Sequence, residues 1–289
     1  HSGVILVSRD GGEVWTEQFD GYQVNQLMLD TAAAAVHAKT QELAAVSAED
    51  KARLQGELDD LDYLLSDSRS FDDGGPTRPF LDVCFINEEE GMAVGQFGLV
   101  VKTSDGGKTW TSPVVAIENP EGLHFNSILW ADGCWFIGGE RGFAARSLDN
   151  GVSWDVLSTP YDGSFFAVGA DQRSVILLGL RGNAVISFDR GDSWETVDTQ
   201  ASASLTSVSF LADGRLLVSQ YAPNLLISDT SRTELTPLPW KAGTRITAFT
   251  MAADGALITV GMGGEKRIAK EDFSLTGSAG PKASTTTSN

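Results

Sequence analysis

The chain is poor in the residues that build metal sites and disulfide frameworks. Its 289 residues include only two cysteines, Cys84 and Cys134, and three widely separated histidines, His1, His37 and His124. Because no C-x-x-C pair is present, we expect no zinc site and no bound metal or cofactor. The two cysteines could form a disulfide in an oxidising compartment, but we expect buried free thiols.

Positive charge and long apolar runs are also scarce. The 39 acidic residues outnumber the 21 lysines and arginines, which gives a net charge of −18 and a pI near 4.4. This charge makes nucleic acids and anionic lipid headgroups poor partners. No run of eighteen apolar residues occurs, so the sequence predicts no transmembrane span. A hydrophobic content of 42% nevertheless predicts a folded protein with a substantial core.

The sequence contains four copies of one eight-residue phrase, with the pattern Ser or Thr, any residue, Asp, any residue, Gly, any residue, usually Ser or Thr, and Trp. We call the copies boxes 1 to 4, and they span Ser8–Trp15, Thr103–Trp110, Ser147–Trp154 and Ser187–Trp194. The phrase predicts a tight β-hairpin, in which Asp bonds the N–H two residues on, Gly supplies a positive φ and Trp begins the return strand. The structural residues of the turns are Asp10, Gly12 and Trp15; Asp105, Gly107 and Trp110; Asp149, Gly151 and Trp154; and Asp189, Gly191 and Trp194.

The boxes recur with a nearly constant period. Thr103, Ser147 and Ser187 are 44 and 40 residues apart, and further steps of 41 lead to Ser228 and Ala269, where the box has decayed. Between boxes lies a G-x-x-G turn, found at Gly95–Gly98, Gly139–Gly142, Gly179–Gly182 and Gly261–Gly264. A unit of about 40 residues with four short strands predicts the blade of an all-β β-propeller, with six box registers visible.

The stretch Gly91–Trp110, GMAVGQFGLVVKTSDGGKTW, carries a family resemblance. It resembles the Asp-box (BNR repeat) β-propellers, and in particular the bacterial relatives of the photosystem II stability and assembly factor. The resemblance implies an exported, non-enzymatic propeller, usually seven-bladed, that assembles or supports a membrane protein complex. Some bacterial members are typically encoded beside transporters of the RND (MMPL) family, which makes such a transporter the implied partner.

Alignment on the boxes matches Ser2–Ser8 with Phe97–Thr103 and places His1 in the middle of a blade. A fold does not naturally begin on half a sheet with an unpaired edge. We therefore expect an upstream segment that completes this blade, adds a seventh and carries an export signal to the periplasm. The predicted propeller covers residues 1–23 and 67–276, and the small polar residues 277–289 read as a flexible tail.

Residues 24–66 interrupt the period and predict a helical hairpin. The first helix should run from Val24 to about Val46, and Ser47 should cap a second helix that ends before residues 67–79 lead back to the sheet. The second helix carries a stripe of leucines that we expect to pack on the alanine run Ala32–Ala35 of the first. These leucines are Leu54, Leu58, Leu61 and Leu65.

Two surfaces could bind a partner, and a structural role remains open for each. The hairpin either caps the flank of the propeller or docks a partner, with Leu54, Leu58 and Leu61 as candidate contacts. The G-x-x-G turns should lie on the face opposite the boxes. Their candidate contacts are Gln96, Phe97, Arg141 and Arg181, with Tyr221 in the decayed blade. The two arginines are either solvated turn residues or a basic spot for a carboxylate of the partner.

Enzymatic activity is not expected, and no residue is assigned a catalytic role. A sialidase needs three arginines on a carboxylate and a Tyr–Glu pair, but Tyr161 and Tyr221 have no motif-paired Glu. Arg78-Pro79 only partly matches the expected Arg-Ile-Pro. The alternative is a glycan-binding or sialidase-like hydrolase propeller. In that case Trp130 and Trp240 could stack on sugars, whereas Trp135 lies in a core strand.

Overall fold

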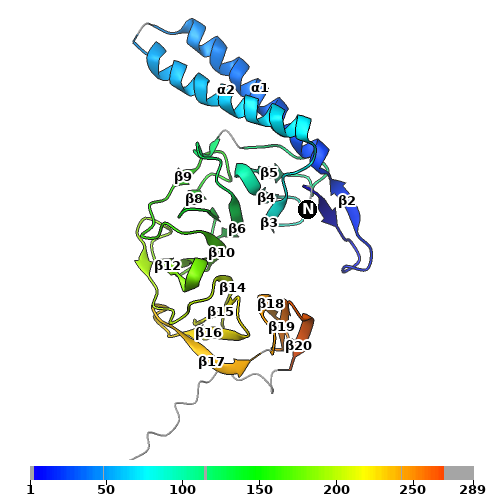
Figure 1. Ribbon diagram of the computed structural model, residues 1–289, viewed down its shortest axis with the longest axis vertical. Helices are drawn as coiled ribbons and strands as arrows, with labels where there is room; N and C mark the ends of the chain where they lie inside the picture. The colour runs from blue at the N-terminus through cyan, green and yellow to red at the C-terminus, as the bar shows by residue number, and fades with distance from the viewer. Residues whose placement is uncertain (1–2, 48, 114–115, 242, 270–289) are drawn as a thin grey trace, which may run out of the picture. The chain divides into compact units, whose positions relative to one another are not determined.

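The computed structural model describes residues 3–47, 49–113, 116–241 and 243–269, so the expected tail 277–289 lies outside the described residues. The described chain forms six β-sheets and a pair of helices, and it divides into two compact units (Figure 1). Unit 1 comprises His1–Leu180 and Val185–Thr196, and unit 2 comprises Arg181–Ala184 and Val197–Asn289. Apart from Ala184, the first four sheets belong to unit 1 and the last two to unit 2.

Each sheet is a run of short antiparallel strands that follow one another in the sequence. The sheets of unit 1 are β1 (Ile5–Val7) and β2 (Thr16–Phe19); β3 (Phe80–Phe85), β4 (Gly91–Gly95) and β5 (Val100–Thr103); β6 (Phe125–Ala131), β7 (Cys134–Gly139), β8 (Ala144–Ser147) and β9 (Asp155–Val156); and β10 (Phe165–Ala170), β11 (Val175–Gly179), β12 (Ala184–Ser187) and β13 (Glu195–Thr196). Short 3₁₀ turns span Gln96–Gly98 and Leu180–Gly182.

Unit 2 continues the same pattern. Its sheets are β14 (Leu205–Phe210), β15 (Leu216–Gln220), β16 (Asn224–Ser228) and β17 (Leu235–Lys241); and β18 (Ile246–Met251), β19 (Leu257–Gly261) and β20 (Gly264–Ile268). The six described sheets correspond to the six box registers, and five of them have the three or four strands of a propeller blade. The seventh blade stays a prediction.

The first strand of every blade is bulged at the same place, which shows how regular the repeat is. The register shifts lie between Phe80 and Asp82, Phe125 and Ser127, Phe165 and Ala167, Leu205 and Ser207, and Ile246 and Ala248. In unit 1 the residue after the bulge links neighbouring blades. Asp82 Oδ2 accepts bonds from Ser127 Oγ at 2.8 Å and Ile128 N–H at 2.9 Å, and Ser127 Oγ accepts one from Val168 N–H at 3.2 Å.

Apolar side chains fill the space between consecutive blades of unit 1. Met92 and Val94 of β4 pack with Ile128, Trp135 and Ile137 of the next blade, and the fully buried Trp135 confirms its predicted place in the core. Position 83 of β3 corresponds to position 128 of β6, yet Val83 is 52% exposed whereas Ile128 is 3% exposed. Within unit 1, no described residue covers that side of β3 as Met92 and Val94 cover Ile128.

The helices α1 (Gly21–Ala45) and α2 (Lys51–Gly74) form the predicted antiparallel hairpin within unit 1 (Figure 1). α1 begins three residues before the expected Val24 because Asp20 and Gln23 form a capping box, a D-x-x-Q signal that the sequence analysis missed. The expected cap at Ser47 is wrong. α2 begins at Lys51, with Asp50 at the N-cap position and no side-chain cap bond.

α2 also runs past residue 66, which corrects the expectation that residues 67–79 are a connecting segment. It ends at Gly74, where Gly75 has a φ of 83° and donates its N–H to Asp72 O. Asn25 of α1 donates from Nδ2 to the carbonyls of Phe71 and Gly75 at 2.9 and 3.0 Å. These bonds satisfy carbonyls that a helix end leaves unpaired, and they hold α1 to the C-terminal turns of α2.

The base of α1 is part of the unit 1 core. Val24 and Met28 are at most 1% exposed and pack with Ala93, Leu99 and Val101 on one face of the β3–β5 blade. The structural role considered for the hairpin, packing on the propeller, therefore applies to its base. Its far end begins beyond Ala32, the last fully buried residue of α1.

The G-x-x-G turns are required by a close approach of two backbone segments. A Cβ on Gly95, Gly139, Gly179 or Gly261 would lie 2.0 to 2.8 Å from the carbonyl oxygen of the residue that precedes the blade's first strand. The residue after each glycine donates its N–H to that carbonyl, for example Glu140 to His124 O at 3.0 Å. Only glycine leaves room for this contact, which joins the turn to the start of the blade.

We expect Gly139→Ala to destabilise the protein by about 1–3 kcal/mol, because the new Cβ would lie 2.5 Å from His124 O. Urea unfolding would measure the change. The control is Gly56→Ala in α2, where no atom would lie within 4 Å of the new Cβ. That change should stabilise the helix by about 1 kcal/mol. An unchanged urea midpoint for Gly139→Ala would contradict the close approach.

Candidate partner-binding site

The boxes are closed by a Ser or Thr hydroxyl, which the sequence analysis did not identify. In each box this hydroxyl donates to Oδ1 of the Asp at 2.7 to 2.9 Å and accepts the N–H of the Gly at 2.7 to 2.9 Å. The Asp accepts the N–H four residues on at 2.8 to 3.0 Å. The predicted bond from the N–H two residues on is wrong, because that N–H belongs to the Gly and donates to the hydroxyl instead. The four glycines have the predicted positive φ, from 80° to 96°.

The box carboxylates are strongly acidic because they are hydrogen-bonded. In boxes 2 to 4, the hydroxyl of Thr109, Ser153 or Ser193 donates to Oδ2 of the Asp at 2.6 Å. This bond, together with backbone N–H donors, lowers the pKa of Asp105, Asp149 and Asp189 from 3.8 to about 2. Box 1 has Val14 at the hydroxyl position, and the pKa of Asp10 is lowered mainly by the backbone N–H of Val14.

The boxes also tie neighbouring sheets of unit 1 together through the carbonyl of their fourth residue. Gln18 donates to Gly106 O at 2.6 Å, Lys102 donates to Asn150 O, and Arg146 donates to Arg190 O at 2.8 Å. Three successive boxes thus receive a side chain from the preceding sheet. The box aspartates and carbonyls therefore have structural roles, because their hydrogen bonds close the turns and link neighbouring sheets.

The decayed box that begins at Ser228 still has a turn closed by an aspartate. This residue, Asp229, stands at the second position of the pattern, whereas the Asp of the other boxes stands at the third. Asp229 Oδ1 accepts the N–H of Thr233 at 3.0 Å, and Ser231 Oγ donates to Oδ2. The missing Trp is replaced in the core by Leu235, which is fully buried. The turn therefore survives without the aromatic ring that marks the other boxes.

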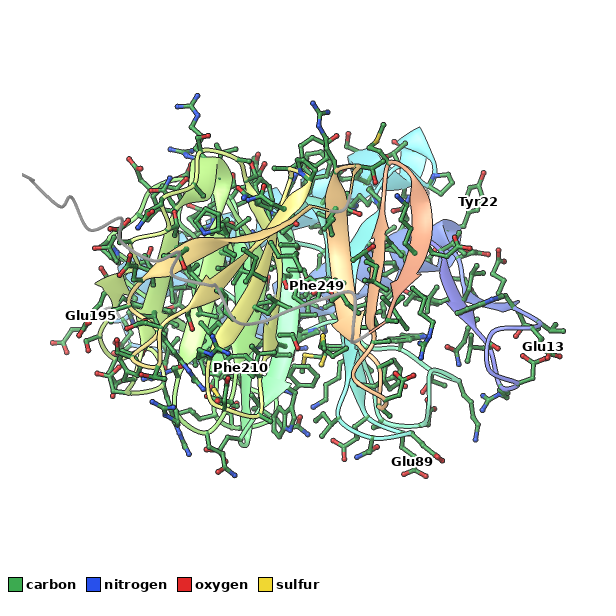
Figure 2. All side chains as sticks on the ribbon, turned by 90° about the horizontal axis from the view of Figure 1, so that it is seen from below. Glu13, Tyr22, Glu89, Glu195, Phe210 and Phe249 are labelled. Carbon is green, nitrogen blue, oxygen red and sulfur yellow. The ribbon has the colours of Figure 1, made fainter. Side chains whose placement is uncertain are left out.

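The boxes and the G-x-x-G turns lie at opposite ends of each blade, as predicted. Gly91 of β4 pairs with Thr103 at the box end, whereas Val94 pairs with Val100 beside the G-x-x-G turn. The turn between β3 and β4 also lies at the box end, where Gly106 N–H donates to Glu89 O. Figure 2 shows Glu13, in box 1, and Glu89 with their carboxylates directed away from the strands.

Phe97, Arg141 and Arg181 occupy equivalent positions in successive G-x-x-G turns, with φ values of 56°, 51° and 56°. This left-handed conformation is uncommon for residues other than glycine, so its recurrence shows that the three turns share one backbone shape. The guanidinium of Arg141 pairs with Glu121, so its charge is already engaged. Arg181 is exposed, and it forms no ion pair with any of the described residues.

Phe97 connects the turn to the hairpin. Its ring lies 5.1 Å from that of Phe71 in α2 and 4.7 Å from that of His124, measured between centroids. The Arg78 guanidinium also lies over the Phe71 ring, 3.8 Å from its centroid. Phe97 is nevertheless 42% exposed, so part of its ring remains available to a partner. Gln96 beside it is half-buried.

The other predicted contacts differ in accessibility. Tyr221, in unit 2, is 41% exposed and lies under the guanidinium of Arg245 at 5.0 Å. Leu58 and Leu61 are half-buried in the hairpin. Leu54 is fully buried, so it stabilises the helix pair and offers no surface to a partner. Here the structure corrects the sequence-based hypothesis for Leu54, because a side chain packed inside the helix pair cannot also contact a partner.

A groove of about 1090 Å³ runs between the hairpin and the adjoining blades of unit 1. One wall is formed by α1 and α2, and the other by the turn at Phe97 and Gly98 together with residues 116–120 and Gly122. Leu61 and Phe97, two of the predicted contacts, both line it. The hairpin and the G-x-x-G end, considered separately in the sequence, therefore meet at one site.

The residues considered for a sialidase or sugar-binding function make contacts within the fold. Arg78 is 2% exposed beneath Phe71, and burial lowers the pKa of its guanidinium to about 10. The hydroxyl of Tyr161 donates to Leu180 O at 3.0 Å. Trp130 packs edge-on against Trp135 at 5.2 Å and is partly buried. The side chain of Trp240 lies outside the described residues.

The two cysteines are free thiols, as expected. Cys134 is buried, whereas Cys84 is only partly buried, and burial raises the pKa of both thiols, that of Cys134 to about 11. Among the described residues, no cluster of three His, Cys, Asp or Glu side chains is placed to hold a metal ion. None of the described helices has the length and apolar character needed to span a membrane.

Residues 76–279 match the model of a protein family described as the photosynthesis system II assembly factor YCF48. Two solved YCF48 structures have a similar fold. YCF48 bound to a D1 peptide is similar with a TM-score of 0.53 and 20% identity, over 64% of this chain and 60% of that one. YCF48 from Cyanidioschyzon merolae has the same TM-score and identity, over 66% of each chain.

A propeller of another kind is also similar. The WD40 β-propeller domain of Doa1 has a TM-score of 0.53 and 14% identity, over 69% of this chain and 68% of that one. At these identities the likeness shows the fold, and this chain spans less than two thirds of the two YCF48 chains. No curated protein matches the sequence.

The lowered pKa values of the box aspartates predict acid sensitivity. A carboxyl whose pKa is about 2 when folded and 3.8 in its ordinary state stabilises the protein above pH 4, and this contribution disappears as the pH falls toward 2. We expect Asp149→Asn to lower Tm at neutral pH and to flatten the fall of Tm between pH 4 and pH 2.

The matched control is Asp10→Asn, because box 1 lacks the hydroxyl donor. This change should alter the pH profile of Tm less than Asp149→Asn does. Thermal unfolding followed by circular dichroism at pH 2 to 5 would measure both variants. Equal profiles for the two variants would contradict the role assigned to the Ser153 hydroxyl.

Proposed function

Because the chain belongs to the photosynthesis system II assembly factor YCF48 family, we propose that it is a non-enzymatic accessory or assembly propeller that binds a membrane protein complex. The solved YCF48 structure with a D1 peptide supports a role in protein binding for a propeller of this family. The observation that carries the proposal is the groove in which the hairpin meets the G-x-x-G end of the blades.

The arrangement of the two blade ends supports this proposal. At the box end, carboxylates and carbonyls are used in turns and in ties between sheets. At the other end, the turn side chain of Phe97 remains partly exposed beside a groove. Long insertions in a repeat array commonly lie on the binding side, and α1 and α2 form such an insertion.

The specific partner that we propose is an RND (MMPL) family transporter, with the protein acting at the periplasmic side of the membrane. This choice rests on the bacterial relatives that the Gly91–Trp110 motif resembles. The glycan-binding and hydrolase alternatives have less support, because Arg78 is buried and Trp130 is packed against Trp135.

A shortened hairpin would test the proposal while preserving the fold. Lys39 Nζ bonds Glu57 Oε2 at 2.7 Å, and Asn25 bonds Phe71 O, so these pairs define which residues face each other across the helices. Replacing residues 37–59 with a short Gly-Ser turn removes the far end and retains the buried Val24 and Met28. Removing the whole hairpin would instead uncover the apolar face of the β3–β5 blade.

We expect the full chain to recover a membrane protein complex from solubilised membranes, and the shortened variant to recover at least about tenfold less. Mass spectrometry would identify the partner, and circular dichroism would check that the variant is folded. Arg181→Glu tests the G-x-x-G end separately. Recovery of no membrane protein by the full chain, with binding on a glycan array, would replace this proposal with the glycan-binding alternative.

A further inference from the structure

We propose that the groove between the hairpin and the blades binds a basic segment of a partner protein, in which lysines or arginines flank a large apolar side chain. This inference rests on the proposed function and specifies the chemistry of the partner. Its evidence is the charge, the apolar lining and the fixed geometry of the groove.

The charge of the groove is strongly negative. The described residues that line it carry six carboxylates and one ammonium group, which leaves five net negative charges. The carboxylates are those of Glu42, Glu57, Asp59, Asp60, Asp67 and Glu118, and the ammonium is that of Lys39.

The ammonium group of Lys39 does not offset this charge for an incoming ligand. Lys39 Nζ lies 2.9 Å from Glu42 Oε2 and 2.7 Å from Glu57 Oε2, so it is engaged within the hairpin. Asp60 and Glu118 lie on opposite walls of the groove. Neither carboxylate forms an ion pair with any of the described residues. An ammonium or guanidinium group between these walls would meet complementary charge from both sides.

The lining of the groove also contains apolar surface. Leu61 and Ala35 contribute partly exposed side chains from the helices, and Trp154 contributes one from the blade wall. Ile117 and Phe125 also line the groove but are buried. Phe97 adds the exposed part of its ring at one end. A ligand with charged groups alone would leave this apolar surface exposed to water. An apolar side chain between two cationic side chains would cover it.

The walls are held in place before a ligand binds. Phe71 of α2 contacts Phe97 of the blade, and Asn25 bonds the end of α2, so both helices are fixed at the base of the groove. On the other wall, Asn119 accepts Leu123 N–H and donates to Leu123 O, both at 3.0 Å, which closes the turn at residues 119–123. A preformed groove avoids part of the ordering cost of binding.

The test uses a short synthetic peptide in which lysines flank leucine and phenylalanine, and the same peptide with glutamates in place of the lysines. Isothermal titration calorimetry with the full chain should show binding of the lysine peptide only, and this binding should weaken as salt is added. The variant Asp60→Lys/Glu118→Lys reverses one charge on each wall. It should weaken binding of the lysine peptide by at least about tenfold.

The matched control is Glu49→Lys/Asp62→Lys, which changes the net charge equally at exposed positions that do not line the groove. It should bind the lysine peptide within about twofold of the unchanged chain. Equal losses in both variants would mean that the overall negative field attracts the peptide, and would overturn the groove assignment. Absence of binding by the unchanged chain would overturn it as well.

The same variants separate this inference from the proposed function. If the full chain recovers a membrane complex and Asp60→Lys/Glu118→Lys recovers it equally well, the groove assignment fails and the proposed function stands. If no complex is recovered but the lysine peptide binds in the groove, the proposed function fails and the groove assignment stands.

Discussion

The hydrogen-bonded box turn is the constraint on which the regular part of the molecule depends. One hydroxyl, as in Ser147, links the Asp carboxylate to the Gly N–H and so closes the turn. The closed turn presents the carbonyl of its fourth residue to the preceding sheet, where a side chain such as Lys102 bonds it. A local device therefore also sets the spacing of neighbouring blades, which the apolar residues between them then fill.

At the other end of the blade, a different constraint leaves surface free for function. Glycine at positions such as Gly139 allows two backbone segments to approach closely, and the residue two positions on, such as Arg141 or Phe97, has a positive φ. Backbone contacts hold this turn, so the side chain at its central position differs between blades, as Phe97, Arg141 and Arg181 show. Phe97 illustrates the consequence, since it joins the blade to the hairpin and still exposes part of its ring.

The hairpin gives this chain a feature that its family match does not include. The matched residues begin at position 76, after α2 has ended, so one wall of the groove lies outside the matched region and the other lies within it. The family accounts for the blades, and the insertion accounts for the acidic wall. In such an arrangement, the fold common to the family supplies the scaffold, and the inserted helices determine which partner is bound.

The sequence alone determined the blades, the box turns and the presence of two antiparallel helices, because each depends on local patterns that repeat or alternate. It also placed Trp135 in the core. It did not determine that α2 continues to Gly74, because the bond from Asn25 and the contact of Phe71 with Phe97 join residues far apart in the chain. Tertiary structure likewise decided that Leu54 is buried and that Leu61 and Phe97 line one groove, since side-chain exposure depends on which surfaces pack together.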